Sequence, residues 1–116
     1  MLYRDKILSK AKQAVKSREQ DDGYGKPINN FVFTASYYQA HLGVEITPFD
    51  VGAMFILSKL SRLQSNPYHE DSWADIAGYA AITAEAMKDI QDNGYPQQNQ
   101  SNIVHVQFDS DFSEDQ

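Results

Sequence analysis

Cysteine is absent from this chain of 116 residues, which excludes a disulfide scaffold, a zinc ribbon and a cysteine nucleophile. Long apolar runs are also lacking, because no stretch approaches the roughly 18 residues that a membrane span requires. A chain of this length forms one domain and buries a limited core, so its helices favour an oligomeric partner. We therefore expect a cytoplasmic domain that forms a homo-oligomer and has no membrane partner.

Each end of the chain lacks charge of one sign almost completely: the N-terminal end has few acids, and the C-terminal end has no bases. Residues 1–18 carry six basic groups and one acid, whereas residues 89–116 carry six acids and no base. The net charge of −6 disfavours nucleic acid as a partner, because phosphate contacts dominate that affinity. The basic segment can instead pair with an acidic partner surface, or with the acidic tail of its own chain or of a neighbouring subunit.

Apolar residues recur at helical spacing along four segments, which predicts an all-α domain of about four helices over residues 1–94. The first segment covers residues 2–19 and ends at the glycines and proline of residues 21–27. Residues 28–41 are rich in β-formers, which alone would favour a strand. However, Phe31, Tyr38 and Leu42 keep helical spacing and Gly43 suits a helix C-terminus, so we predict a second helix.

The third helix has the clearest start signal, because Thr47 can cap it, Pro48 takes the first helical position and Asp50 completes a capping box. Its apolar residues are distributed nearly all round, so we expect it to be buried. A fourth helix is predicted over about residues 68–91, closed by Asn93 and Gly94. Small residues on it allow another helix to approach closely: Ala74, Ala77, Gly78, Ala80, Ala81 and Ala84.

Residues 95–116 form a polar, acidic tail that is predicted to be irregular, with at most one short strand over residues 103–108. Its acids could mimic nucleic-acid phosphates on a basic host protein. The predicted partner-binding residues of the tail are Asp109, Asp111, Phe112, Glu114 and Asp115.

Charged residues on the third and fourth helices make the main candidate site. Lys59 and Arg62 share one helix face, and Asp71, Asp75 and Tyr79 form a stripe on the next helix. In one interpretation the two cations hold phosphate while Asp71 and Asp75 hold Mg²⁺. In the other, the charges form a salt-bridge network that locks the helical hairpin, and Asp71 caps its helix.

Two further residues belong to this candidate site and its surroundings. Tyr24 is predicted to line the ligand site, because an aromatic ring can stack on a nucleotide base. His69 lies beside acidic residues, and we expect it to cap a helix rather than to bind a metal ion.

Three motifs occur in order along the chain: Tyr24-Gly25-Lys26-Pro27-x-x-Asn30-Phe31, Lys59-Leu60-Ser61-Arg62, and Asp71-Ser72-Trp73-x-Asp75-Ile76-Ala77-Gly78-Tyr79. Over about residues 8–88 the chain resembles a family of small phage and prophage proteins of unknown function. That family is distantly similar to the MazG-type nucleoside-triphosphate pyrophosphohydrolases, which are helical and usually oligomeric and use acidic motifs to hold Mg²⁺. The resemblance implies a MazG-like helical bundle in the cytoplasm of an infected or lysogenic bacterium.

The chain departs from the MazG-type pattern at the metal site. Lys59 and Arg62 stand where acids would be expected, and Asp71 and Asp75 are spaced i,i+4 rather than i,i+3. Losing those acids removes most of the charge that binds a metal ion. If the chain is an enzyme, the resemblance implies a Mg²⁺-dependent nucleoside-triphosphate pyrophosphohydrolase.

Two functions follow from these patterns. The first is a phage accessory protein that binds a nucleotide or another phosphorylated small molecule in a helical pocket, through Lys59, Arg62, Asp71, Asp75, Tyr79 and Tyr24. The second is an interaction protein that inhibits or redirects a host factor through the acidic tail.

Overall fold

The protein is built from four helices, which confirms the predicted all-α class. The computed structural model describes residues 2–19 and 26–96, and no strand occurs in these two ranges. The helices are α1 (Tyr3–Glu19), α2 (Pro27–Leu42), α3 (Pro48–Ser65) and α4 (Glu70–Asn93). Within this described part, none of the helices combines the length and the apolar character needed to cross a bilayer. Tyr24 and the whole predicted tail site lie outside the described residues.

The helix ends follow local capping chemistry. At the start of α3 the Thr47 amide donates to the Asp50 carboxylate over 2.9 Å, and the Asp50 amide donates to the Thr47 hydroxyl over 3.2 Å. This reciprocal pair confirms the predicted capping box. Gly43 and Gly94 follow α2 and α4 with φ of 73° and 75°, a left-handed backbone that side chains disfavour.

The N-terminus of α4 differs from the prediction in two respects. The helix begins at Glu70 rather than near residue 68, and its cap is His69, whose Nδ1 accepts from the Ser72 amide over 3.2 Å. Asp71 therefore does not cap the helix. It occupies the second helical position, and its carboxylate is held by a lysine of α1 instead. The prediction that His69 serves as a cap is confirmed.

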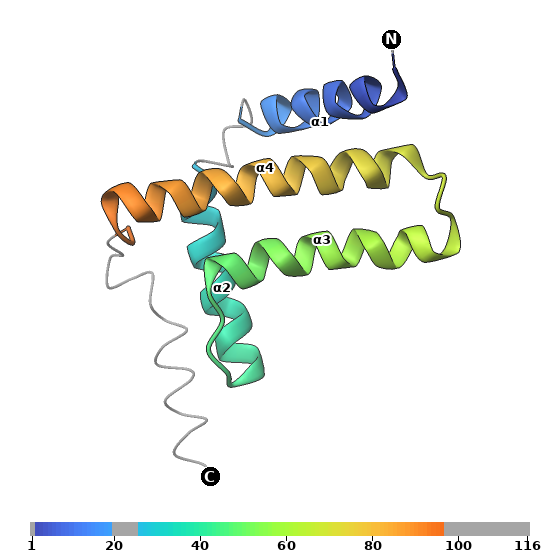
Figure 1. Cartoon of the computed structure of the whole chain (residues 1–116). Helices are drawn as coiled ribbons and strands as arrows, with labels where there is room; N and C mark the ends of the chain where they lie inside the picture. Colours follow the sequence, from blue (N-terminus) through green and yellow to red (C-terminus); the bar gives the residue numbers. More distant parts are fainter. Residues whose placement is uncertain (1, 20–25, 97–116) are drawn as a thin grey trace.

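Figure 1 shows α4 lying between α1 and α3, with α2 crossing behind α3 and α4 near one end. The short connection between Ser65 and Glu70 makes α3 and α4 an antiparallel hairpin, and α1 runs alongside α4 in the same direction. Of the four helices described, α4 contacts the other three, whereas α1 contacts only α4. The fold is thus a layer of three helices with α2 covering part of one side.

The buried core lies where α2 crosses the hairpin. Ile28, Phe31 and Ala35 of α2 pack with Val51 of α3 and Ala86 of α4. Burial of these apolar side chains removes them from water and supplies the main driving force for this packing. The core is therefore concentrated at one end of the layer, and α1 is not part of it.

Two glycines bring helices close to α4 to different degrees. Gly52 of α3 faces Thr83, and a Cβ built at Gly52 would lie 2.9 Å from the Thr83 Cβ and closer still to its hydroxyl and methyl groups. Gly78 of α4 faces α1, where a Cβ would meet the Val15 side chain at 3.6 Å, an ordinary contact distance. The closest approach to α4 is therefore made by α3 at Gly52, and α1 packs against the small residue Gly78 at an ordinary distance.

The expectation that α3 is buried all round is wrong. Leu57 and Leu60 are 60% and 42% exposed, because the neighbours of α3, which are α2 and α4, leave part of its circumference uncovered. On α4, Trp73 is 40% exposed as well. Apolar side chains therefore remain on the surface of the hairpin.

We predict opposite effects for alanine at the two glycines. Gly52→Ala should lower the free energy of unfolding by about 1–3 kcal/mol, because Thr83 is a stiff β-branched residue whose hydroxyl bonds the Tyr79 carbonyl. Gly78→Ala should raise it by about 0.5–1 kcal/mol, because alanine is the better helix former and the space accommodates it. Urea unfolding followed by circular dichroism measures both. Equal effects would contradict the close approach at Gly52.

Candidate functional site

The predicted charged residues are ion-paired rather than directed into an open pocket. The Lys59 ammonium of α3 lies 3.1 Å from the Asp75 carboxylate of α4, and the two side chains are 21% and 30% exposed. The contact joins the two helices of the hairpin in the second turn of α4. This is the arrangement expected if the charges lock the hairpin, and a phosphate ligand would have to displace Asp75 from Lys59.

Asp71 is held by α1 instead of α3. The Lys10 ammonium lies 2.5 Å from the Asp71 carboxylate and 2.7 Å from that of Glu70, and Lys6 lies 3.2 Å from Glu70. Lys6 and Lys10 are one turn apart on α1, so both reach the first turn of α4. The basic segment is therefore neutralised at least in part by acids of the domain itself, at Glu70 and Asp71.

These ion pairs shift the ionisation of the groups involved. Hydrogen bonds to the two carboxylates raise the pKa of Lys10. The hydrogen bond from Lys10 lowers the pKa of Asp71, and bonds from Lys10 and then Lys6 lower that of Glu70. Asp71 is exposed while Lys10 and Glu70 are half-buried, so water and salt still reach and screen the pairs. Their main effect is to fix where α1 lies on α4.

The other two described residues of the predicted ligand site differ in their surroundings. Arg62 is exposed, and no ion pair joins it to another described residue, although its charge contributes to lowering the pKa of Asp71. The Tyr79 ring packs against the Phe55 ring with centroids 5.1 Å apart. The cavity beside Asp75 and Tyr79 has a volume of about 10 Å³, room for one water molecule at most.

A magnesium site would require a rearrangement of the carboxylates. Asp71 and Asp75 are bound by lysines of two different helices, and among residues 2–19 and 26–96 no three acidic or histidine side chains gather as metal ligands would. Mg²⁺ binds through oxygen ligands that must be free of other cations. The assignment of Asp71 and Asp75 to a metal ion remains a prediction.

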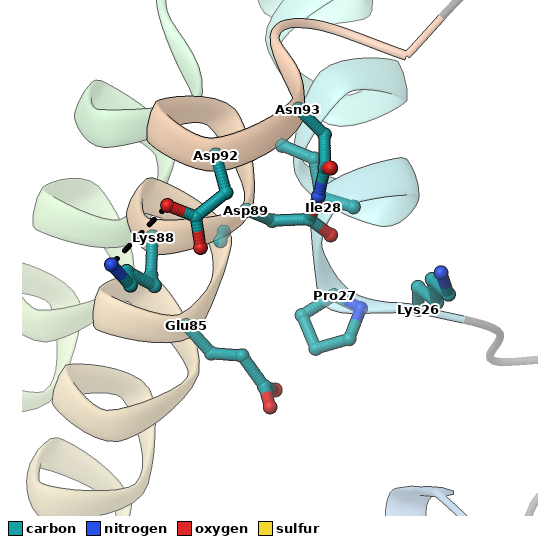
Figure 2. Close-up of a pocket in the computed structure, with 9 residues that line it drawn as sticks. Lys26, Pro27, Ile28, Glu85, Lys88, Asp89, Asp92 and Asn93 are labelled. Carbon is teal, nitrogen blue, oxygen red and sulfur yellow. Dashed lines mark hydrogen bonds and ion pairs between the residues drawn. The ribbon is translucent and has the colours of Figure 1, made fainter.

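A larger cleft lies where α2 begins beside the end of α4. It has a volume of about 550 Å³ and is lined by Lys26, Pro27, Ile28, Glu85, Ala86, Lys88, Asp89, Asp92 and Asn93. Figure 2 shows the side chains of Glu85 and Asp89 reaching from α4 toward Pro27, with Asp92 paired to Lys88 at 3.2 Å. The first turn of α2 contains no acidic residue, so these carboxylates supply the negative charge that a helix N-terminus favours.

An apolar groove of about 430 Å³ runs along the contact of α1 with α4. It is lined by Leu8, Ala11 and Val15 on α1 and by Ala77, Gly78 and Ala81 on α4, with Lys12 and Lys16 at its rim. Leu8 is 60% exposed there. Sequence reasoning identified the small residues of α4 but not this groove, because the partner helix could not be known from spacing alone.

Taken together, the four helices, the paired charges and the exposed apolar side chains define a small all-α protein whose charged residues tie its helices to one another. The chain belongs to the DUF6378 family, whose model, a domain of unknown function, matches residues 6–87. It is 40% identical over 91 residues to the Gene 55 protein of Mycobacterium phage L5, covering 78% of this chain and 57% of that protein. It is 37% identical over 76 residues to the Gene 55 protein of Mycobacterium phage D29, covering 66% and 50%.

These comparisons confirm the predicted relationship to a small phage family of unknown function. The chain spans about half the length of the curated relatives it matches. No solved structure matches it. The likeness to MazG-type pyrophosphohydrolases therefore stays a prediction from the motifs.

We predict that Lys10→Met raises the pKa of Asp71 and of Glu70 toward their ordinary values of 3.8 and 4.5. A lowered carboxyl pKa stabilises the folded state above the ordinary value, and this stability is lost as the pH falls through the lowered value. The docking of α1 should therefore weaken in acid. Carbon NMR titration of the carboxyl groups measures the shifts, and Lys12→Met, an exposed lysine two residues away and on another face, is the control. An unchanged Asp71 pKa in Lys10→Met would contradict the assigned ion pair.

Proposed function

We propose that this domain works by binding another protein surface through the uncovered side of its three-helix layer. We call this side the open face and define it by Leu8, Leu60, Trp73, Ala77, Ala80 and Ala84. The proposal is carried by one observation, which is that apolar side chains of three helices lie on the same side of the layer and opposite α2.

The position of the open face follows from helix geometry. Residues nine apart are separated by two and a half turns, so they lie on opposite sides of a helix. Leu60 comes nine residues after Val51, and Ala77 comes nine residues before Ala86, while both Val51 and Ala86 contact α2. Leu60 and Ala77 therefore lie away from α2. The groove beside Ala77 extends this side of the layer to Leu8 on α1.

Asp71 and Asp75 lie on the other side of α4 for the same reason. Ala80 and Ala84 come nine residues after Asp71 and Asp75, which pair with Lys10 and Lys59. Between Trp73 and Ala84 the sole charged residue is Asp75. Charged residues are depleted at the centres of protein interfaces, so the side of this stretch that faces away from Asp75 has the composition of such a centre.

Exposure makes the open face a favourable place to bury apolar surface. Leu8, Leu60 and Trp73 are 60%, 42% and 40% exposed. Each square ångström of apolar surface removed from water contributes roughly 25 cal/mol. The Trp73 indole also donates to the Pro67 carbonyl over 2.8 Å, which holds the ring in position before a partner binds. Contiguous exposed apolar patches of this kind mark interaction sites.

We predict that a photo-reactive amino acid at position 84 crosslinks the protein to a partner in phage-infected bacteria. The matched control is the same amino acid at Ser9, which is exposed on α1 and away from the open face. Crosslinked products are measured by gel shift and mass spectrometry. Products from position 84 and none from position 9 support the proposal. Absence of products from both positions overturns it.

Interaction through the acidic tail is the alternative that the sequence predicts, and the same experiment separates it from the open face. Replacing Asp109, Asp111, Glu114 and Asp115 by their amides in the full chain removes the charge of the tail without altering α4. If the crosslink from position 84 persists in this variant, the open face binds on its own. If it disappears, the tail carries the interaction.

A second candidate function, binding of a phosphorylated small molecule, is favoured by the cations on the other side of the layer. Arg62 is exposed beside the Lys59–Asp75 pair and forms no ion pair within the described part of the chain. A nucleotide phosphate could take the place of Asp75 on Lys59, and Mg²⁺ carried with that phosphate could then bind the carboxylate released. After this exchange Lys59 faces the phosphate and the Asp75 carboxylate faces Mg²⁺, so each keeps a partner of opposite charge. Lys59, Arg62 and Asp75 then take the predicted roles.

For this second function we predict that nucleoside triphosphates with Mg²⁺ release heat on binding, and that Lys59→Met weakens the affinity at least tenfold. Lys88→Met is the matched control, because Lys88 also pairs with an aspartate, at 3.2 Å, but on the far end of α4. Isothermal titration calorimetry measures both variants. No heat with any nucleotide, or equal losses in the two variants, would remove this function.

A further inference from the structure

We propose that the groove between α1 and α4 binds the C-terminal segment of its own chain, residues 104–112, in an extended form. The groove has a volume of about 430 Å³, and small and apolar side chains of both helices line it. Leu8 at its edge is 60% exposed. The described part of the chain ends at Pro96, and residues 97–116 follow it. The side-chain pattern, the reach and the charge of these residues fit the groove.

The apolar residues of this segment share one side when the chain is extended. Successive side chains of an extended chain point to opposite sides. One side then carries four residues that are all apolar except at position 110: Val104, Val106, Phe108 and Phe112. The other side carries polar and acidic residues: His105, Gln107, Asp109 and Asp111. The first side can therefore pack in an apolar groove while the second stays in water.

The chain between α4 and this segment is long enough to reach the groove. Ala81 lines the groove and comes twelve residues before Asn93, the last residue of α4. At a rise of about 1.5 Å per residue, this separation is about 18 Å. Residues 97–103 span up to about 23 Å when extended, at about 3.3 Å per residue. The segment that follows can then run along α1 toward its N-terminus.

Basic side chains without an acidic partner in the described part of the chain lie along this path. Lys12 and Lys16 are at the rim of the groove, and Arg4 lies one turn before Leu8 on the same face of α1. All three cations are exposed, and no ion pair joins any of them to another described residue. They differ in this from the two lysines of α1 that pair with the first turn of α4.

The acids of the C-terminal segment complement these cations. Residues 97–116 contain four acids and neither lysine nor arginine. Asp109 and Asp111 come directly after Phe108, so a Phe108 ring in the groove brings both carboxylates to the basic face of α1. Complementary charges fix the register of a bound segment. Because a short tether holds the segment at an effective concentration on the order of millimolar, binding within one chain is favoured over binding to a second copy.

A segment bound in the groove would cover one end of the open face. Leu8 and Ala77 belong both to the groove and to the open face, so a partner of the open face would have to displace residues 104–112 from them. The segment would thereby regulate access to that face. This consequence rests on the proposed function, whereas the binding of the segment to the groove does not.

The test places a nitroxide spin label at one position of the full chain, which has no cysteine of its own. Ser9→Cys places the label on α1 next to Leu8, and His41→Cys places it near the end of α2, which Figure 1 shows beyond α3 on the side away from α1. Both positions are exposed. NMR measures the broadening of the amide signals of residues 104–112. The label at position 9 should broaden them strongly and the label at position 41 should not, and equal broadening overturns the proposal.

Two matched substitutions test which side of the segment enters the groove. Phe108→Ser removes the aromatic ring at the centre of the segment, so the broadening from the label at position 9 should be lost. Gln107→Ser changes the adjacent residue, which points to water in the proposed arrangement, and should leave the broadening intact. Loss of the broadening in both variants, or in neither, contradicts the proposal.

A mixing experiment separates binding within one chain from binding between two copies. Spin-labelled protein is mixed with unlabelled protein that is isotope-enriched for NMR, so that broadening reports contact between copies alone. We expect no broadening in this mixture, and broadening as strong as within the labelled protein overturns binding in the same chain. The crosslink from position 84 reports separately on the proposed function. Its absence, with the groove result as expected, removes that function and leaves the present inference standing.

Discussion

The structure depends on α4, a single helix that packs against three others without being enclosed by them. It meets α3 through Thr83, α2 through Ala86 and α1 through Gly78. These contacts are compatible because the residues concerned are small, so each neighbour approaches without displacing the next. A side chain larger than alanine at Gly78, or a larger one at Thr83 or Ala86, would separate α4 from one of its partners, and the layer would lose that helix.

Charge and apolar surface are segregated on α4 by its helical period. Asp71 and Asp75 point to the side where Lys10 and Lys59 lie, and Ala80 and Ala84, nine residues later in each case, point to the other. The first side joins α1 and α3 to α4 with ion pairs that are screened by water and contribute orientation more than stability. Between Trp73 and Ala84 the second side carries no charge. The same helix therefore holds the domain together on one side and presents small apolar side chains to solvent on the other.

Much of this fold follows from the sequence, and the parts that do not have identifiable physical reasons. The capping box of Thr47 and Asp50 and the left-handed Gly43 depend on residues close in the chain, so local patterns predict them. Helical spacing also outweighed the β-forming residues of α2. The exposure of Leu57 and Leu60 could not be predicted, because it depends on how many helices surround α3.

The candidate site, like the fold, could be predicted from the sequence only in part. The pairing of Lys59 with Asp75 lies within one hairpin, and one of the two interpretations of the sequence contained it. The role of Lys10 was missed, since its partners Glu70 and Asp71 are 60 and 61 residues away and no local rule connects them. The spacing of Lys6 and Lys10 indicates that they share one face of α1, but it does not identify the acids that this face contacts.

The separation between α1 and its partner has a consequence for the order in which the protein forms. During synthesis α1 is made before α4, and Glu70, which Lys10 contacts at the start of α4, comes 60 residues later. Contacts between distant segments require closure of a long loop and form late. The α3–α4 hairpin and α2 can assemble from segments that are neighbours in the sequence. By contrast, α1 can pack only after α4 has formed. Of the four described helices, the first in sequence is thus expected to pack last.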